Sequence, residues 1–428
     1  SAMQARHALS SFEEELVLST LSKYLFNEDS EFPLQMGIVR CLKHYKVENS
    51  SNILQKGLNE TYLNILSEVT NSLLSVARGY HPSDDFIKRI EMNLDSIAQR
   101  VYQLVLFLDR LPDDENCFLI KDHIESDIEK IIQIMLKLGI LHDPKTPIET
   151  YIQYVANQDS ELMPYVLELV DTTFSPGNRK LTMPLIDVDV DEVKVGEDLF
   201  DELLVDFDDL ILFWIHGVHK WKTAIALNYI IKSNRQDLLK IIDWDKVQNT
   251  IFIDQLFSRI EDQSGTIKEI IPLKMFNLKK ETDMYSILEK TILLKSVDLF
   301  KNIPGDVLTR IAQISNETYH SEEYLMFSEG DYGDSMYIVV EGNVRIHKGE
   351  HHIVTLGKST ILGEMALLDQ EPRSADATAE AETTVLKIEQ DGFYELMAGN
   401  SEIMQQIIKM LSGRLRDTNI KLQEALAK

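Results

Sequence analysis

The sequence predicts a multidomain protein of α and β class, with an all-α domain over residues 1–283 and a second domain over residues 284–428. The second domain is expected to be an antiparallel β-barrel or jelly roll with flanking helices. Three observations lead to this prediction. The 428 residues exceed the roughly 250–300 that one core supports. Apolar residues recur at helical spacing through the first two thirds, and short alternating strands separated by glycines begin after about Met284.

The N-terminal region carries apolar stripes that return every three or four residues, as on one face of an α-helix. Two of these stripes comprise Leu94, Ile97, Val101, Leu104, Val105 and Leu108, and Ile124, Ile128, Ile131, Ile132, Met135 and Leu138. We interpret them as helix faces that pack against neighbouring elements.

Three segments of this region share a pattern of helix, polar break and second helix: Leu34–Leu58, Leu162–Ile186 and Trp221–Ile242. The breaks, where Asn, Ser, Pro or Gly end one helix or cap the next, are predicted at residues 48–52, 175–178 and 233–237. Helix pairs that bury a face by stacking on their neighbours form an α-solenoid. The organisation resembles HEAT repeats. This resemblance implies a HEAT-like solenoid that contacts partner proteins or other parts of the chain.

Two groups of side chains in this region are of types that bind metals. One begins in the manner of a calcium loop, with the alternating acids Asp187, Asp189 and Asp191, but the turn glycine that such a loop needs is missing. The acidic segment 187–209 is therefore interpreted as a solvated linker or an acidic face. His216 and His219 are three residues apart and would share one helix face, but nothing fixes a third ligand. No metal is predicted.

The C-terminal region starts with two predicted helices, residues 287–294 and 304–314, with Pro304 in the first turn of the second. Alternating residues then predict strands at 336–340, 344–347 and 353–356, joined by turns at 341–343 and 348–350. The glycines that separate the short strands stand at positions 330, 333, 342, 349, 357 and 363. Short strands with regular turns are typical of a small antiparallel barrel or jelly roll.

The segment 362–375 carries the residues with ligand-binding chemistry. Gly363 lets the backbone come close to a ligand, and a helical turn that begins at Glu364 would direct its first N–H groups at an anion. Arg373 can add a charge-assisted bidentate contact. Because a carboxylate only accepts hydrogen bonds, Glu364 suits a sugar hydroxyl and not a phosphate.

The pattern Gly363-Glu364-x-Ala366-Leu367, followed by a short loop and Arg373-Ser374-Ala375, resembles the phosphate-binding cassette of cyclic-nucleotide-binding domains. The phrases that extend the resemblance over the C-terminal third are Leu299-Phe300-x-x-Ile303-Pro304, Phe327-x-x-Gly330-Asp331 and Tyr337-x-Val339-x-x-Gly342-x-Val344. The resemblance implies that Glu364 holds the ribose 2′-hydroxyl and that Arg373 and backbone N–H groups hold the cyclic phosphate. It also implies that Ser374 hydrogen-bonds the phosphate or the base. The residues implied to bind the nucleotide are Gly363, Glu364, Met365, Ala366, Arg373, Ser374 and Ala375.

One residue departs from the family's pattern. Asp376 stands where the family often has Ser, Thr or another neutral residue. An inward-facing Asp376 would oppose a phosphate, whereas an outward-facing one would not, and strand alternation leaves both orientations open. The expected ligand is a cyclic nucleotide, cyclic AMP before cyclic GMP. The alternative is a degenerate cassette that no longer binds it.

A last helix is predicted from an apolar face that comprises Ile403, Ile407, Met410, Leu411 and Leu415. This face suits core packing or contact with a second subunit in a dimer. In the family this helix covers the base, so the resemblance implies a lid contact at Arg416.

The whole organisation, helical repeats followed by one such domain, resembles the soluble region of bacterial ATP/ADP-carrier-like transporters of the major facilitator class. The resemblance implies a membrane domain upstream of Ser1 and a location in the cytoplasm, at the cytoplasmic face of the inner membrane in the full-length protein. We therefore expect a cyclic-nucleotide sensor that regulates through the helical scaffold. The alternative from another class is a non-catalytic scaffold for protein–protein interaction.

Composition bears on several other functions. A net charge of −27 disfavours nucleic acid as a partner. Only Cys41 and Cys117 occur, which fits a reducing compartment. No apolar run is long enough to cross a bilayer. No nucleophile elbow, Walker, kinase or zinc-protease motif is present, so the chain is not expected to be an enzyme.

Overall fold

The structure is a computed structural model that divides the chain into two compact units: residues 1–112 with 124–207, and residues 113–123 with 208–428. It describes residues 2–9, 12–27, 32–45, 47–59, 62–79, 83–156, 161–200, 206–217, 219–248, 250–258, 270–272, 275, 284–301, 303–365, 371–399, 403–404, 407–408 and 411–412. The domain boundary predicted at 283/284 falls beside undescribed residues. The division into domains 1–283 and 284–428 stays a prediction.

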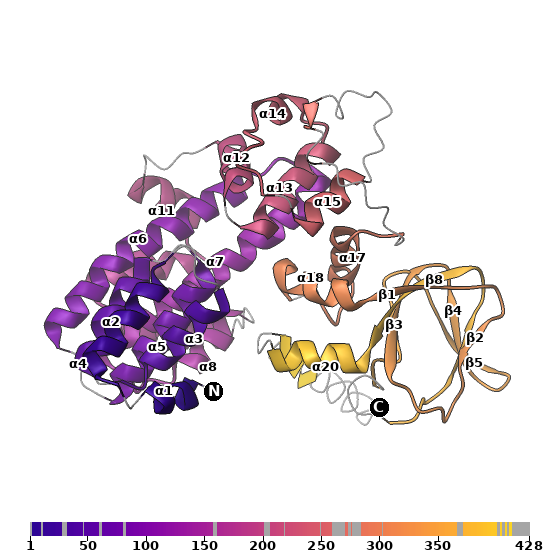
Figure 1. Cartoon of the computed structure of the whole chain (residues 1–428), viewed down its shortest axis with the longest axis horizontal. Coiled ribbons are helices and arrows are strands. Elements are labelled where there is room, and N and C mark those ends of the chain that lie inside the picture. The colour runs from indigo at the N-terminus through magenta and orange to yellow at the C-terminus, as the bar shows by residue number, and fades with distance from the viewer. Residues whose placement is uncertain are drawn as a thin grey trace. The chain divides into compact units, whose positions relative to one another are not determined.

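The first unit is helical in its described residues, as the sequence predicts (Figure 1). Its helices are α1 (Ala2–Leu9), α2 (Glu14–Leu25), α3 (Phe32–Leu42), α4 (Val47–Lys56), α5 (Leu63–Gly79), α6 (Asp84–Asp109), α8 (Ile148–Ala156), α9 (Met163–Thr173), α10 (Pro176–Thr182) and α11 (Glu192–Leu199), together with α7 (Phe118–Gly139), which begins in the second unit. Most of the predicted stripe of α6 is buried, with Leu94 and Ile97 each 1% exposed, whereas Leu104 and Leu108 are half-buried. The fully buried Tyr102 donates its hydroxyl hydrogen bond to the carbonyl of Leu181 at 3.0 Å.

The three predicted helix pairs are present as α3–α4, α9–α10 and, in the second unit, α13 (Lys220–Lys232) with α14 (Gln236–Ile241). The first predicted break was wrong, because residues 48–52 lie inside α4. Asn and Ser are tolerated in a helix whose apolar face is buried, so their presence alone does not end one. The arrangement of the described helices does not show a solenoid. The HEAT-like stacking stays a prediction.

The residues that were compared with metal ligands have structural roles. Asp191 caps α11 by accepting from the N–H of Lys194 at 3.0 Å. His216 ends α12 (Phe207–His216) and His219 precedes α13, so the two histidines do not share a helix face as considered from the sequence. His216 Nε2 accepts the N–H of Asp243 at 2.9 Å. No group of three metal-ligand side chains occurs among the residues that the structure describes.

The second unit joins further helices to the β-sheets (Figure 1). Its remaining helices are α15 (Ile251–Ser258), α17 (Ile287–Lys295), α18 (Gly305–Ile314) and α20 (Gln390–Gly399). Its strands are β1 (Asn316–His320), β2 (Leu325–Phe327), β3 (Ser335–Glu341), β4 (Val344–Lys348), β5 (His351–Leu356), β6 (Ile361–Leu362), β7 (Asp376–Ala379) and β8 (Thr383–Glu389). The helices predicted at 287–294 and 304–314 and the three predicted strands are therefore confirmed, and β4 and β5 form a hairpin, but β3 pairs with β6 and β8 and does not form a hairpin with β4. Pro304 takes the N-cap position of α18, one residue before the predicted place.

The eight strands form two antiparallel sheets, with strand orders β1-β8-β3-β6 and β2-β7-β4-β5. Each sheet interleaves early strands with late ones, which is the strand arrangement of an eight-stranded jelly roll. The strand pairs of the described residues keep the two sheets separate and do not close a barrel.

The central strand β3 is buried on both faces. Met336, Ile338 and Val340 lie in a core cluster with residues of α17, α18 and α20. Val339 instead packs in a second cluster with residues of β4, β6, β7 and β8. Residues 336–340 are apolar throughout, which agrees with burial on both faces, because helices cover the outer face of this sheet.

Two buried lysines fasten α17 within the second unit. Lys290 pairs with Glu317 of β1 at 3.3 Å and donates to the carbonyl of Ser315. Lys295 pairs with Asp122, at the start of α7, and donates to the carbonyl of Lys301 at 2.8 Å. Burial is the largest influence on Asp122 and raises its pKa, against the opposing effect of Lys295. None of the described helices is long and apolar enough to cross a membrane.

Candidate functional site

The candidate site is built around Arg373, in the segment that leads into β7. Its backbone N–H donates to the carbonyl of Asp331, and its own carbonyl accepts the N–H of Gly330, both at 2.8 Å. A β-bridge between Tyr332 and Pro372 continues this pairing. The loop between β2 and β3 therefore fixes the backbone of Arg373.

The guanidinium of Arg373 reaches across to the other sheet. Nη2 donates to the carbonyl of Ser335 at 2.7 Å, and Nη1 donates to the carbonyl of Gly363 at 3.1 Å. The ring of Phe327 lies 4.3 Å from the guanidinium carbon, a cation–π contact. Phe327 in turn stacks on Tyr337, with ring centroids 6.1 Å apart.

Two glycines make room for this guanidinium. A Cβ at Gly333 would lie 2.7 Å from Nη2 and nearer still to Cζ and Nε, and a Cβ at Gly363 would collide with Nη1. Gly363 also has a φ of +77°, which L side chains rarely adopt. The close neighbour of Gly363 in the structure is Arg373, and the predicted approach of its backbone to a ligand stays a prediction.

The charge of Arg373 is enclosed without a carboxylate partner. The residue is 7% exposed, and no ion pair joins it to an acid in the described part of the chain. Its Nε–H is buried and finds no acceptor among the described residues. Burial lowers the pKa of the guanidinium, although Tyr337, Asp334 and Asp331 act in the opposite direction. A buried charge is costly unless it is paired, so this position suits an anionic group from a ligand.

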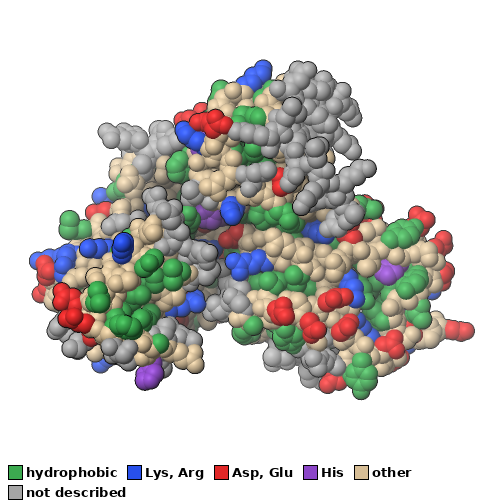
Figure 2. Space-filling model, viewed as in Figure 1, with side chains coloured by type: hydrophobic (Ala, Val, Ile, Leu, Met, Phe, Trp, Pro, Cys, Tyr) green, Lys and Arg blue, Asp and Glu red, His purple; other side chains and the backbone are tan. Residues whose placement is uncertain are grey.

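The face of the strand region that Figure 2 shows is not basic. Acidic side chains are spread over the visible face of the strand region (Figure 2), and the chain has 70 Asp and Glu against 43 Lys and Arg. An anion would therefore depend on the buried guanidinium and not on a basic surface.

The other predicted site residues divide into three groups. Helical backbone begins at Glu364, as predicted, and Met365 follows with 60% of its surface exposed. Ser374 is exposed and Ala375 is buried. Ala366 and Arg416 lie outside the described residues.

The orientation of Asp376, which the sequence left open, is defined by its contacts. Its Oδ1 accepts the N–H of Glu329 at 2.8 Å, and its Oδ2 accepts the N–H of Gly349 at 3.1 Å. These bonds hold the pKa of Asp376 below its usual value, because they favour the charged carboxylate. The carboxylate is thus occupied by two loops and makes no ion pair with Arg373.

Three residues around the guanidinium were not predicted as site residues: Phe327, Gly333 and Ser335. Phe327 was noted only as part of a family phrase, and Gly333 only as one of the regularly spaced glycines. A second glycine three residues after Gly330 was a usable signal, since a turn alone does not need both. The carbonyl of Ser335 left no signal, because every residue has one.

The last helical segment is described only in part. Ile403 and Ile407 are buried against α18 and α20, as the predicted face requires. Leu411 is 40% exposed. Met410 and Leu415 lie outside the described residues, and the predicted dimer stays a prediction.

The model of the cyclic nucleotide-binding domain family matches residues 317–400. The chain therefore contains a cyclic nucleotide-binding domain in this range, which includes Arg373 and its surroundings.

Three curated relatives are similar to part of the chain. A CRP-like cAMP-activated global transcriptional regulator of Mycobacterium tuberculosis is 26% identical over 139 residues, which are 31% of this chain and 62% of the regulator. The cyclic AMP receptor protein of Thermus thermophilus is 32% identical over 135 residues, 30% of this chain and 62% of that protein. The human cGMP-dependent protein kinase 2 is 26% identical over 191 residues, 39% of this chain and 25% of the kinase. The chain thus spans less than two thirds of each of these relatives.

Proposed function

We propose that this protein is a cyclic-nucleotide sensor, in which the second unit binds a cyclic nucleotide and passes the bound state to the helices around it. Arg373 holds the negatively charged cyclic phosphate. Gly363 lets the backbone approach the ligand, and Glu364 accepts a hydrogen bond from the ribose 2′-hydroxyl.

The observation that carries the proposal is the buried guanidinium of Arg373, which no carboxylate of the described residues neutralises. It lies inside the range that matches the family model. Its Nη1 and Nη2 donate to neutral carbonyls, and its Nε has no acceptor among described residues. A cyclic phosphate supplies the charge and the acceptor oxygens that this position lacks.

The nucleotide itself is a finer proposal. The printed names of the relatives refer to cyclic AMP in two bacterial proteins and to cyclic GMP in the kinase. We take cyclic AMP as the first ligand to test and cyclic GMP as the second. The family resemblance implies that Ser374, which is exposed, contacts either the phosphate or a guanine base.

The sequence carries no motif of the catalytic classes considered above. We therefore propose that binding of the nucleotide serves regulation and that the protein is not an enzyme. A ligand shifts a conformational equilibrium only by its difference in affinity for the two states. The elements proposed to differ are α17, α18 and α20, which share one core cluster with β3 and β8. The relatives reported above are regulators and a kinase. The resemblance to transporters, with its membrane domain and HEAT-like solenoid, therefore stays a prediction.

Thermal unfolding with and without nucleotide tests the proposal. A ligand at about 100 times its Kd stabilises the folded state by about 2.7 kcal/mol. Cyclic AMP or cyclic GMP should therefore raise the Tm of the wild-type protein, and 5′-AMP should raise it less. Arg373→Lys should lose the shift, because lysine cannot reproduce the forked donors. Arg345→Lys, which changes a half-buried arginine paired with Glu323, is the matched control and should keep it.

Two outcomes contradict the sensor proposal. One is a Tm that neither cyclic nucleotide changes, which favours the scaffold alternative with a degenerate cassette. The other is an equal shift in the wild-type protein and in Arg373→Lys, which places the ligand elsewhere.

A further inference from the structure

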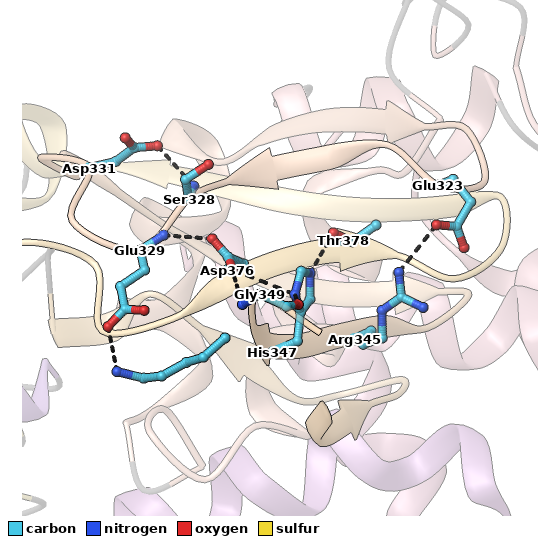
Figure 3. Close-up of polar contacts among 10 residues, drawn as sticks. Glu323, Ser328, Glu329, Asp331, Arg345, His347, Gly349, Asp376 and Thr378 are labelled. Carbon is cyan, nitrogen blue, oxygen red and sulfur yellow. Dashed lines mark hydrogen bonds and ion pairs between the residues drawn. The ribbon is translucent and has the colours of Figure 1, made fainter. Parts of the chain in front are cut away.

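Asp376 connects two loops that are far apart in the sequence. Its carboxylate accepts one backbone N–H from Glu329, in the loop between β2 and β3, and one from Gly349, at the tip of the β4–β5 hairpin (Figure 3). The two oxygen atoms serve different loops at 2.8 and 3.1 Å, so the carboxylate acts as a two-sided clamp. Only 18% of the side chain is exposed, which protects both bonds from competing water.

The first of these loops also holds Arg373. Gly330 and Asp331, the two residues after Glu329, exchange backbone hydrogen bonds with Arg373 at 2.8 Å. The Asp331 side chain stiffens the turn by accepting the N–H of Ser328 at 2.8 Å (Figure 3). Gly333, in the same loop, touches the guanidinium so closely that it has no room for a Cβ. A displacement of this loop therefore moves the Arg373 backbone and its guanidinium together.

The second loop is held to the same strand by His347. Its Nδ1 contacts the carbonyl of Gly349 at 2.7 Å and lies 3.5 Å from Oδ2 of Asp376. Its Nε2 contacts the hydroxyl of Thr378 at 2.9 Å, two residues along β7 from Asp376 (Figure 3). The hairpin tip thus has two independent attachments to β7. The loop that carries Gly330 is bound by the Asp376 side chain of β7 and by the backbone of Arg373, which precedes β7.

Of two neighbouring ion pairs, one joins the same two loops at the surface and the other joins neither. Lys348 pairs with the Glu329 side chain, and about half of each side chain is exposed. Arg345 pairs with Glu323, which lies before β2. Exposed pairs of this kind contribute little to stability. The Arg345–Glu323 pair, which joins neither loop, provides the control on the same sheet.

We propose that Asp376 is a positioning residue for Arg373: by clamping the β2–β3 loop to β7 it holds the guanidinium at the place where an anionic phosphate group binds. The identity of the ligand rests on the proposed function, whereas the position of the clamp rests on the hydrogen bonds of Asp376 alone. It also accounts for an acid beside a phosphate site, since the carboxylate is turned to two backbone N–H donors and away from the ligand.

The test compares Asp376→Ala and Asp376→Asn with Glu323→Gln in the full chain. Circular dichroism and urea unfolding first establish that each variant is folded at the temperature of the assay. Calorimetric titration with cyclic AMP and cyclic GMP then gives the Kd. The Arg373 Nε–H resonance in the ¹⁵N–¹H spectrum, assigned by its loss in Arg373→Lys, reports the guanidinium without any ligand.

Asp376→Ala is expected to weaken binding about tenfold or more, because a displaced guanidinium loses a charge-assisted hydrogen bond. Asp376→Asn keeps one acceptor oxygen and should lie between the alanine variant and the wild type. Both should shift or broaden the Arg373 Nε–H resonance. Glu323→Gln should leave the Kd and the resonance unchanged.

Unchanged affinity and an unchanged Arg373 resonance in a folded Asp376→Ala protein overturn the proposal, even if the urea midpoint falls, because Asp376 is then only structural. A wild-type protein that binds neither nucleotide contradicts the proposed function instead. In that case the Arg373 Nε–H resonance still tests whether Asp376 positions Arg373. A shifted resonance in Asp376→Ala supports this role, and an unchanged resonance refutes it.

Discussion

Replacing Gly333 by alanine is expected to displace the Arg373 guanidinium without straining the backbone. Gly333 is not among the residues of positive φ, so alanine is compatible with its conformation. The new Cβ would lie 2.7 Å from Nη2 and nearer to Cζ and Nε. Ordinary contacts between such atoms begin at about 3.5 Å, so the guanidinium must move by about 1 Å.

The size of the effect follows from what that movement breaks. A hydrogen bond to a charged group contributes about 1.5–3 kcal/mol, and its loss corresponds to about 10- to 150-fold in Kd. We expect Gly333→Ala to weaken cyclic-nucleotide binding within this range. The ligand-free protein should also lose stability, because the same movement disturbs the hydrogen bonds from the guanidinium to the carbonyls of Gly363 and Ser335.

Gly330→Ala is the matched control for the assay, which is calorimetric titration of both variants. Gly330 lies in the same loop with a φ of +86°, but a Cβ there meets no atom within 4 Å. Alanine should therefore cost about 1–2 kcal/mol of folding stability through backbone strain. It adds no atom beside the guanidinium, so the Kd should change less than in Gly333→Ala. The reasoning is refuted if Gly333→Ala binds as tightly as the wild type, or if both variants lose affinity equally.

Three further changes test the packing around the site. Asp122→Ala should lower the free energy of unfolding in urea by about 3–5 kcal/mol, because it leaves the buried ammonium of Lys295 without a carboxylate. An Asp122→Leu, Lys295→Met double variant should recover much of this stability. Equal losses of stability in the single and the double variant would contradict this reasoning. Burial lowers the pKa of His216, whose neutral ring accepts the N–H of Asp243. Because the folded protein favours the neutral ring, the contribution of His216 to folding stability is complete above about pH 6.5 and declines as the pH falls below that value. Urea midpoints measured on both sides of that pH should diverge in the wild type and less so in His216→Gln, and equal divergence would show that another group titrates. Ser286→Ala removes one half of a capping box on α17 and should cost about 1 kcal/mol, whereas an unchanged Tm would contradict the role of this cap.

The sequence predicts secondary structure best where local patterns and tertiary contacts agree. The β4–β5 hairpin is of this kind, since its turn carries Gly349 and its strands carry β-branched residues. The first helix pair is the opposite case. Residues 48–52 were read as a break because Asn and Ser favour caps, but tertiary packing keeps them in α4, where Ser50 is fully buried.

The sequence predicted the charged side chains of the candidate site but not the backbone groups and loops that position them. Arg373 and Gly363 were expected together, and the structure joins them at 3.1 Å. Ser335 contributes only a carbonyl, which the sequence cannot distinguish from any other. The orientation of Asp376 could not be derived, since it depends on N–H groups of loops that lie 47 and 27 residues away along the chain.

The central claim, that Arg373 holds the phosphate of a cyclic nucleotide, is tested most directly by calorimetric titration of the wild-type protein, Arg373→Lys and Arg345→Lys with cyclic AMP and cyclic GMP. The account predicts saturable binding of at least one nucleotide by the wild type and by Arg345→Lys, and a Kd about 10-fold or more higher for Arg373→Lys. Equal affinity in all three proteins, or no binding by the wild type, would contradict it.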